Sequence, residues 1–158
     1  MLIKNITKSF QETQKLGEDF AKEILALRRF ASQGKNNKRA IVFGLQGDLG
    51  SGKTTFIQGF AKGLGVDEKI LSPTFVILKR FAIDKKTFKN FYHIDCYRLK
   101  NEKDILELGI KEIILNSKNI VAIEWPEKIK KVLPKKTITI KFNLVEKNKR
   151  KIILDEII

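Results

Sequence analysis

The sequence predicts an α/β fold in which helices flank a mixed sheet that includes antiparallel hairpins. Two apolar runs, at residues 40–45 and 119–124, have the length and composition of buried strands. A helical pattern follows the first run, and two further pairs of strand-like segments are joined by polar turns. The chain has 158 residues, of which 42% are hydrophobic and 32% charged. We therefore expect one domain over residues 1–158, large enough to bury a core.

The first expected element is a helix that begins after Ser9 and continues to about residue 31. Ser9 and Glu12 stand three residues apart, which is the capping-box pattern of a helix N-terminus. Apolar residues then recur at helical spacing along one face, at Leu16, Phe20, Ile24, Leu27 and Ala31. Thr13 lies on the same face. Its hydroxyl either bonds to its own helix or reaches a ligand at the edge of the core, and spacing alone leaves both open.

A glycine-rich segment follows the first apolar strand and reads Gly47-Asp48-Leu49-Gly50-Ser51-Gly52-Lys53-Thr54. It fits the P-loop pattern, and it stands between a strand and a helix, as that motif requires. In a P-loop, backbone N–H groups and the helix N-terminus surround nucleotide phosphates, the lysine reaches the β- and γ-phosphates, and the hydroxyl binds Mg²⁺. The segment therefore predicts a nucleotide-binding site in a P-loop NTPase-like sheet. The helix that follows is expected to end at Gly65.

Two hairpins are expected further along the chain. Segments 75–83 and 87–95 read as strands that join near residues 84–86, and segments 138–145 and 150–157 read as a terminal pair. Between the hairpins, Asn101 is the expected cap of a short helix closed by Gly109, and another short helix is expected over residues 111–116.

Two carboxylates stand at the ends of apolar strands, Glu124 after residues 120–123 and Asp95 after residues 91–94. Nucleotide hydrolysis in a P-loop protein needs a carboxylate near the Mg²⁺ and the attacking water, so these two can divide that work. Arg98 follows closely and either stabilises phosphate charge or forms a surface ion pair. His93 is expected to be a strand histidine with its polar tip at the surface, rather than a base.

Composition limits the remaining possibilities. The formal net charge is +14, and residues 127–151 hold ten basic and two acidic residues. This segment is either a nucleic-acid face or a set of exchangeable surface lysines, and only six of the 32 basic residues are arginine. The single cysteine, Cys96, excludes an internal disulfide. With neither a signal peptide nor a membrane-spanning run in sight, we expect a cytoplasmic protein.

Five segments together resemble the TsaE family, the small ATPase of bacterial tRNA threonylcarbamoyladenosine (t6A) biosynthesis. They are Glu12-Thr13, the P-loop through Thr55, Ser72-Pro73-Thr74-Phe75, His93-Ile94-Asp95-Cys96-Tyr97-Arg98-Leu99 and Glu124-Trp125-Pro126-Glu127. Their order and spacing fit over about residues 10–130. The Ser-Pro-Thr-Phe and Glu-Trp-Pro-Glu segments are far more specific than the P-loop, and a generic P-loop protein is not expected to carry both.

The resemblance implies a role for each matching position. Thr54 and Glu124 would ligate Mg²⁺, and Asp95 would be the carboxylate required for hydrolysis. The Ser72 to Phe75 segment resembles a switch that senses the nucleotide, and Arg98 is grouped with it. The residues expected to bind the nucleotide are Thr13, on the base side, and Asp48, Leu49, Gly50, Ser51, Gly52, Lys53, Thr54 and Thr55.

The family also implies partners. Its members support a complex of TsaB and TsaD, which modifies adenosine 37 of tRNAs that read codons starting with A, and their ATP hydrolysis is weak without that complex. Two other functions stay open. A small-molecule kinase needs an arginine-rich lid, which is not evident here, and a nucleotide-gated module would dock RNA through its basic C-terminal third. No guanine-reading Asn-Lys-x-Asp motif is evident, which favours ATP.

Overall fold

The computed structural model describes residues 3–31, 38–71 and 77–154. Its helices are α1 (Phe10–Ala31), α2 (Lys53–Leu64), α3 (Glu102–Glu107), α4 (Ile110–Leu115) and the short 3₁₀ helix η1 (Pro126–Ile129). Its strands are β1 (Ile3–Thr7), β2 (Ile41–Gln46), β3 (Leu78–Ala82), β4 (Asn90–Asp95), β5 (Asn119–Glu124), β6 (Ile138–Glu146) and β7 (Lys149–Leu154). The segment expected to act as a switch, Ser72 to Phe75, lies outside the described residues.

The described strands form one mixed sheet in the order β1-β7-β6-β2-β5-β4-β3. The four strands β6, β2, β5 and β4 run parallel, whereas the pairs β3–β4, β6–β7 and β1–β7 are antiparallel. The register pairs Leu45 of β2 with Glu124 of β5, and Glu124 with Asp95 of β4. The expected mixed sheet with hairpins is confirmed, and both carboxylates end neighbouring parallel strands.

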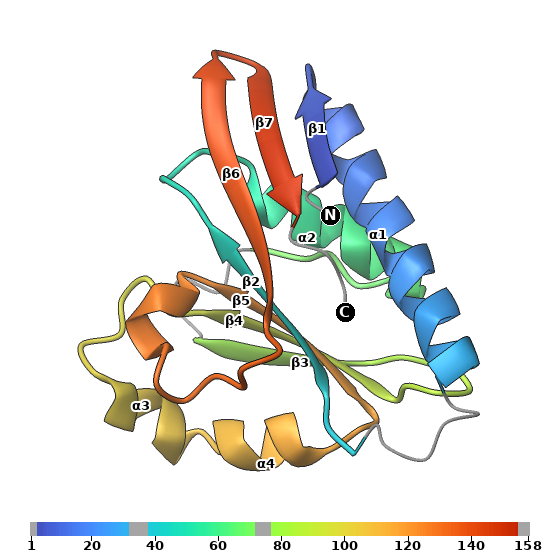
Figure 1. The fold of residues 1–158 in the computed structure, drawn as a ribbon, viewed down its shortest axis with the longest axis vertical. Coiled ribbons are helices and arrows are strands. Elements are labelled where there is room, and N and C mark those ends of the chain that lie inside the picture. The colour runs from blue at the N-terminus through green and yellow to red at the C-terminus, as the bar shows by residue number, and fades with distance from the viewer. Residues whose placement is uncertain (1–2, 32–37, 72–76, 155–158) are drawn as a thin grey trace.

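Helices cover both faces of this sheet (Figure 1). On one face, α1 and α2 pack through aromatic residues against alternate strand positions such as Phe43 and Ala122. On the other face, α3, α4 and η1 pack against the intervening positions, among them Val42 and Val121. Strand residues that alternate along β4 and β5 therefore point to opposite layers.

Close packing of α1 against α2 depends on glycines. A Cβ atom at Gly59 would lie 1.8 Å from the carbonyl oxygen of Gln14, and one at Gly17 would lie 2.1 Å from that of Phe56. The two helices thus meet backbone to backbone, which no larger residue would allow. This contact holds the N-terminal turns of α1 close to the start of α2.

The predicted helix ends are confirmed where the structure describes them. The Ser9 hydroxyl accepts a hydrogen bond from the Glu12 N–H at 3.1 Å, while the Glu12 carboxylate accepts from the N–H of Lys8. The Asn101 side chain accepts from the N–H of Lys103. Gly65 ends α2 in the left-handed region at φ 83°, where glycine carries no steric penalty.

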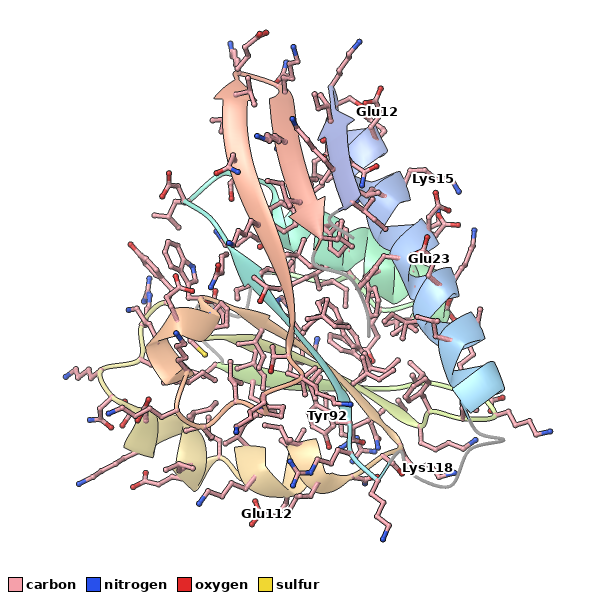
Figure 2. The ribbon with its side chains drawn as sticks, in the orientation of Figure 1. Glu12, Lys15, Glu23, Tyr92, Glu112 and Lys118 are labelled. Carbon is pink, nitrogen blue, oxygen red and sulfur yellow. The ribbon has the colours of Figure 1, made fainter. Side chains whose placement is uncertain are left out.

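The outer face of α1 is charged, and Figure 2 shows Glu12, Lys15 and Glu23 projecting from it. Lys15 pairs with Asp19 one turn along, at 2.8 Å. Leu27, which was expected on the apolar stripe, is 44% exposed, so that part of the pattern was wrong. No helix among the described residues is long and apolar enough to cross a membrane.

The strand β1 was not expected from the sequence. It pairs with β7, so that Ile3 lies opposite Leu154 at the far end of the chain. The strand has only five residues, and they include the polar Lys4 and Asn5, so they carry no clear pattern of a strand. The helical spacing of apolar residues in α1 begins only after this strand. This strand forms because the outer edge of β7 is available for pairing.

Candidate nucleotide-binding site

The loop between β2 and α2 has the backbone of a phosphate-binding turn. Gly47, Gly50 and Gly52 have φ values of 146°, 76° and 102°, a region that side-chain-bearing residues rarely adopt. Gly52 directly precedes α2, so the free N–H groups of that helix's first turn face the space enclosed by the loop. The local geometry is suited to an anion.

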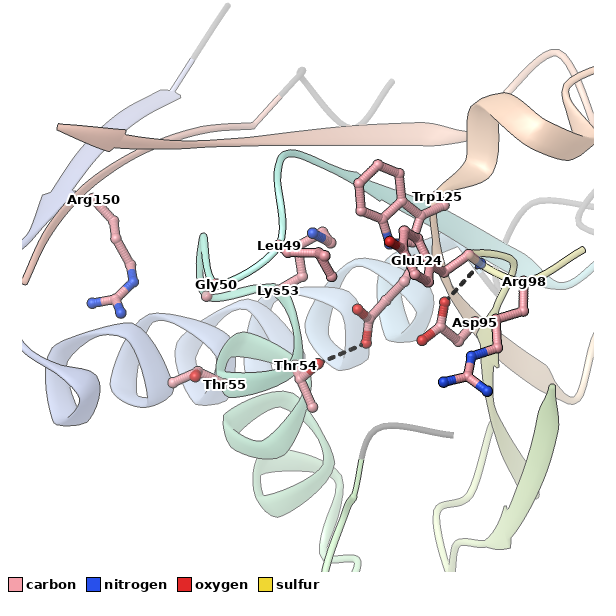
Figure 3. A pocket seen from close by; sticks show the side chains of 12 residues that line it. Leu49, Gly50, Lys53, Thr54, Thr55, Asp95, Arg98, Glu124, Trp125 and Arg150 are labelled. Carbon is pink, nitrogen blue, oxygen red and sulfur yellow. Dashed lines mark hydrogen bonds between the residues drawn. The ribbon is translucent and has the colours of Figure 1, made fainter. Parts of the chain in front are cut away.

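A cavity of about 390 Å³ opens beside this loop. Figure 3 shows Arg150 at one end and Asp95 with Arg98 at the other. Its lining residues are Leu49, Gly50, Gly52, Lys53, Thr54, Thr55, Asp95, Tyr97, Arg98, Glu124, Trp125 and Arg150. The fold therefore brings together most of the predicted site. Thr13, Asp48 and Ser51 are not among the lining residues: Thr13 and Ser51 are buried, and Asp48 is exposed.

Lys53 is buried and folded back onto its own loop. Its Nζ donates hydrogen bonds to the carbonyl oxygens of Gly47 at 2.5 Å and Asp48 at 2.8 Å. The same ammonium lies 4.5 Å from the centre of the Trp125 ring. Burial lowers the pKa of Lys53, because the ammonium loses hydration, although the nearby Glu124 carboxylate opposes this shift. A bound phosphate would place a negatively charged group in direct contact with this ammonium.

Glu124 is the centre of a small polar cluster. Its Oε1 atom accepts hydrogen bonds from Thr54 Oγ1 at 3.0 Å and from His93 Nε2 at 2.9 Å. The side chain of His93 is only 1% exposed. The expectation of a polar tip at the surface was therefore wrong, because the imidazole is turned inward to a carboxylate on the neighbouring strand.

Asp95 stands beside this cluster at the end of β4. Its Oδ1 atom accepts a hydrogen bond from the N–H of Tyr97 at 2.9 Å, which orients the carboxylate within the cavity. Trp125 follows Glu124 and adopts φ 59°, in the left-handed region. Its ring lies 5.1 Å from that of Tyr97, so the two aromatic rings pack together at the wall next to Lys53.

Thr13 lies behind the loop, fully buried. Its hydroxyl donates to the carbonyl oxygen of Ser9 at 3.1 Å and lies 2.8 Å from the hydroxyl of Thr7. A bond to its own helix, one of the two alternatives, is thus present. Its methyl group faces the loop, since a Cβ atom at Gly52 would lie 3.6 Å from it.

Arg150 was not predicted from the sequence as a site residue. This residue of β7 lays its side chain against Gly52, where an added Cβ atom would lie 2.8 Å from Arg150 Cδ and Nε. Its Nε atom is buried without a hydrogen-bond partner among the described residues. No local signal distinguishes it from the other basic residues of its segment, because its position depends on how β7 pairs with β6 and β1.

Comparison with known proteins decides the family. The family model described as "Threonylcarbamoyl adenosine biosynthesis protein TsaE" matches residues 7–152. The chain belongs to the TsaE family. The resemblance seen in five short segments thus extends over nearly the whole chain.

Relatives and a solved structure agree with this family. A "tRNA threonylcarbamoyladenosine biosynthesis protein TsaE" from Treponema pallidum is 38% identical over 108 residues, or 68% of this chain and 76% of the relative. A protein of the same name from Haemophilus influenzae is 33% identical over 126 residues, or 80% of this chain and 72% of the relative. The crystal structure of YdiB from Bacillus subtilis superposes with a TM-score of 0.72 and 27% identity, covering 98% of this chain and 84% of that one.

The residues at the site of this TsaE family member fit a magnesium ion held mainly by a nucleotide. Within the described parts of the chain there is no group of three or more histidine, cysteine or carboxylate side chains arranged around a metal. The Thr54 hydroxyl and the Glu124 carboxylate nevertheless meet at the edge of the loop. Mg²⁺ prefers such oxygen ligands, one or two from protein with phosphate and water completing the set.

Proposed function

We propose that the protein binds and hydrolyses ATP with Mg²⁺ and that this cycle supports t6A formation on tRNA. The observation that carries the proposal is the juxtaposition in one cavity of the P-loop, the Thr54–Glu124 pair and Asp95. The family name supports the link to threonylcarbamoyladenosine biosynthesis.

The chain's own residues divide the work in this proposal. The loop N–H groups and Lys53 hold the phosphates, and Arg150 adds positive charge from the opposite side. Thr54 and Glu124 would hold the metal, which would neutralise charge on the phosphates. Asp95, oriented by the Tyr97 N–H, positions the attacking water and accepts its proton.

The partners are a further part of the proposal. We infer that turnover depends on a complex of TsaB and TsaD, which carries out the transfer to adenosine 37, and that a basic surface over residues 127–151 contacts the tRNA. The protein then acts in the cytoplasm as one domain. The kinase alternative is not favoured, because the family is named for tRNA modification rather than for a small-molecule acceptor.

Measuring phosphate release with and without TsaB and TsaD tests this function. We expect slow release by the protein alone and a changed rate with the complex. Asp95→Asn should bind ATP as the wild type does but hydrolyse it about 10²–10⁴-fold more slowly, the usual contribution of a positioned base. Lys22→Ala, an exposed change on α1, is the matched control and should leave both unaltered.

Two outcomes would contradict the proposal. Equal phosphate release with and without the complex argues against partner dependence. Transfer of the γ-phosphate to a small acceptor, rather than its release as inorganic phosphate, would support the kinase alternative instead.

A further inference from the structure

The imidazole of His93 lies beside the candidate metal site but does not line the cavity. His93, Asp95 and Glu124 occupy positions of β4 and β5 that point to the α1–α2 layer, the same layer as Phe91 and Ala122. Register places Asp95 opposite Glu124, so His93 approaches Glu124 diagonally from two residues earlier on the neighbouring strand. His93 can therefore influence the cavity only through Glu124.

Two donors meet on one oxygen of the Glu124 carboxylate. Oε1 accepts from His93 Nε2 at 2.9 Å and from Thr54 Oγ1 at 3.0 Å. A carboxylate can only accept, so His93 carries a proton on Nε2. These two donors differ in their relation to the metal. The Thr54 hydroxyl is itself an expected metal ligand, whereas the His93 imidazole does not line the cavity.

We propose that His93 is a positioning residue that fixes the orientation of the Glu124 carboxylate for the metal. This inference rests on the proposed function. A bound metal would fix the position of the Thr54 hydroxyl oxygen, and with it the hydrogen bond to Glu124, whereas the hydrogen bond from His93 Nε2 to Oε1 would not depend on the metal. A nearly fully buried carboxylate needs such a donor, since an unpaired buried charge is costly. With Oε1 held by His93, the other carboxylate oxygen, Oε2, keeps one orientation towards the metal site.

The packing of His93 supports this role. Both side chains are almost completely enclosed, at 1% exposed for His93 and 4% for Glu124. They belong to adjacent parallel strands in continuous register, so neither can shift along the sheet independently. Hydrogen-bond partners of metal ligands typically contribute 10–100-fold to metal affinity.

Titration calorimetry of ADP at a series of Mg²⁺ concentrations tests the proposal. His93→Leu should bind ADP without Mg²⁺ as the wild type does, but should need about 10–100-fold more Mg²⁺ to reach the enhanced affinity. His93→Gln, whose amide N–H can reach towards Glu124, should restore most of the Mg²⁺ effect. Phe91→Leu is the matched control: it alters the same face of β4 in the core without touching Glu124.

The control separates positioning from simple packing. Phe91→Leu should lower the thermal midpoint and leave the Mg²⁺ dependence unchanged. If His93→Leu behaves in the same way, His93 only fills the core and the proposal is overturned. If the leucine variant does not fold, His93→Asn replaces it, since its amide is too short to reach Glu124 and should show the same weakened Mg²⁺ dependence. A wild type whose ADP affinity ignores Mg²⁺ would instead refute the metal site of the proposed function.

Discussion

Replacing Gly59 with alanine tests the backbone contact between α1 and α2. The added Cβ would lie 1.8 Å from Gln14 O and 2.6 Å from Gln14 C, whereas carbon atoms pack at about 3.5–4.0 Å. Both obstructing atoms belong to the backbone, so α1 has to move away from α2. Overpacking of this kind costs about 3 kcal/mol, and alanine returns about 1 kcal/mol through its better helix propensity. The net loss is about 2 kcal/mol, or about 4–8 °C in Tm for a chain of this size.

Thermal unfolding of Gly59→Ala, followed by circular dichroism, measures this loss. Gly63→Ala is the matched variant on the same helix. Its Cβ would approach its nearest atoms only to 2.7 Å, so a smaller fall in Tm is expected. ADP affinity should also fall in Gly59→Ala, because moving α1 carries Thr13 away from Gly52. A Tm at or above that of the wild type would refute the reasoning, since it would show that the two helices have room for a methyl group.

Three further predictions concern the site and its surroundings. Burial raises the pKa of the Cys96 thiol to about 12, so iodoacetamide should modify the folded protein far more slowly than the urea-unfolded chain, and equal rates would contradict this burial. Burial lowers the pKa of Lys53 in the folded protein below its ordinary value of 10.5, so at pH values between the folded and unfolded pKa the unfolded chain binds more protons. The free energy of unfolding should therefore rise with pH in that range, and Lys53→Met should remove that rise from urea unfolding curves. Arg150→Met keeps the apolar stem on Gly52 but removes the guanidinium, and calorimetry should show about tenfold weaker ADP binding, with unchanged affinity as the contrary result.

Features with local signals could be predicted from the sequence. The P-loop, the cap at Ser9 and the end of α2 at Gly65 each depend on residues within a few positions, and all three match the structure. The position of Asp95 and Glu124 at the ends of apolar strands was also predicted, and the structure shows in addition that the two strands are parallel neighbours. The assignment of their chemical roles stays a prediction.

Features that depend on distant pairing could not be predicted. His93 looked like a surface residue because its partner, Glu124, is contributed by another strand. Arg150 looked like one of many basic residues, since its approach to Gly52 follows from the register of β7. The strand β1 depends entirely on that same edge. In each case the deciding contact joins segments that lie far apart in the chain.

The pairing of β1 with β7 also has a consequence for synthesis on the ribosome. β1 is translated first among the described strands, yet the edge to which it binds is translated after all the others. Translation adds about 5–20 residues per second, so β1 remains unpaired for several seconds while the P-loop and the central strands are already made. Arg150 arrives with β7 and reaches Gly52 only then. A nascent chain therefore completes its nucleotide pocket only after β7 has left the exit tunnel.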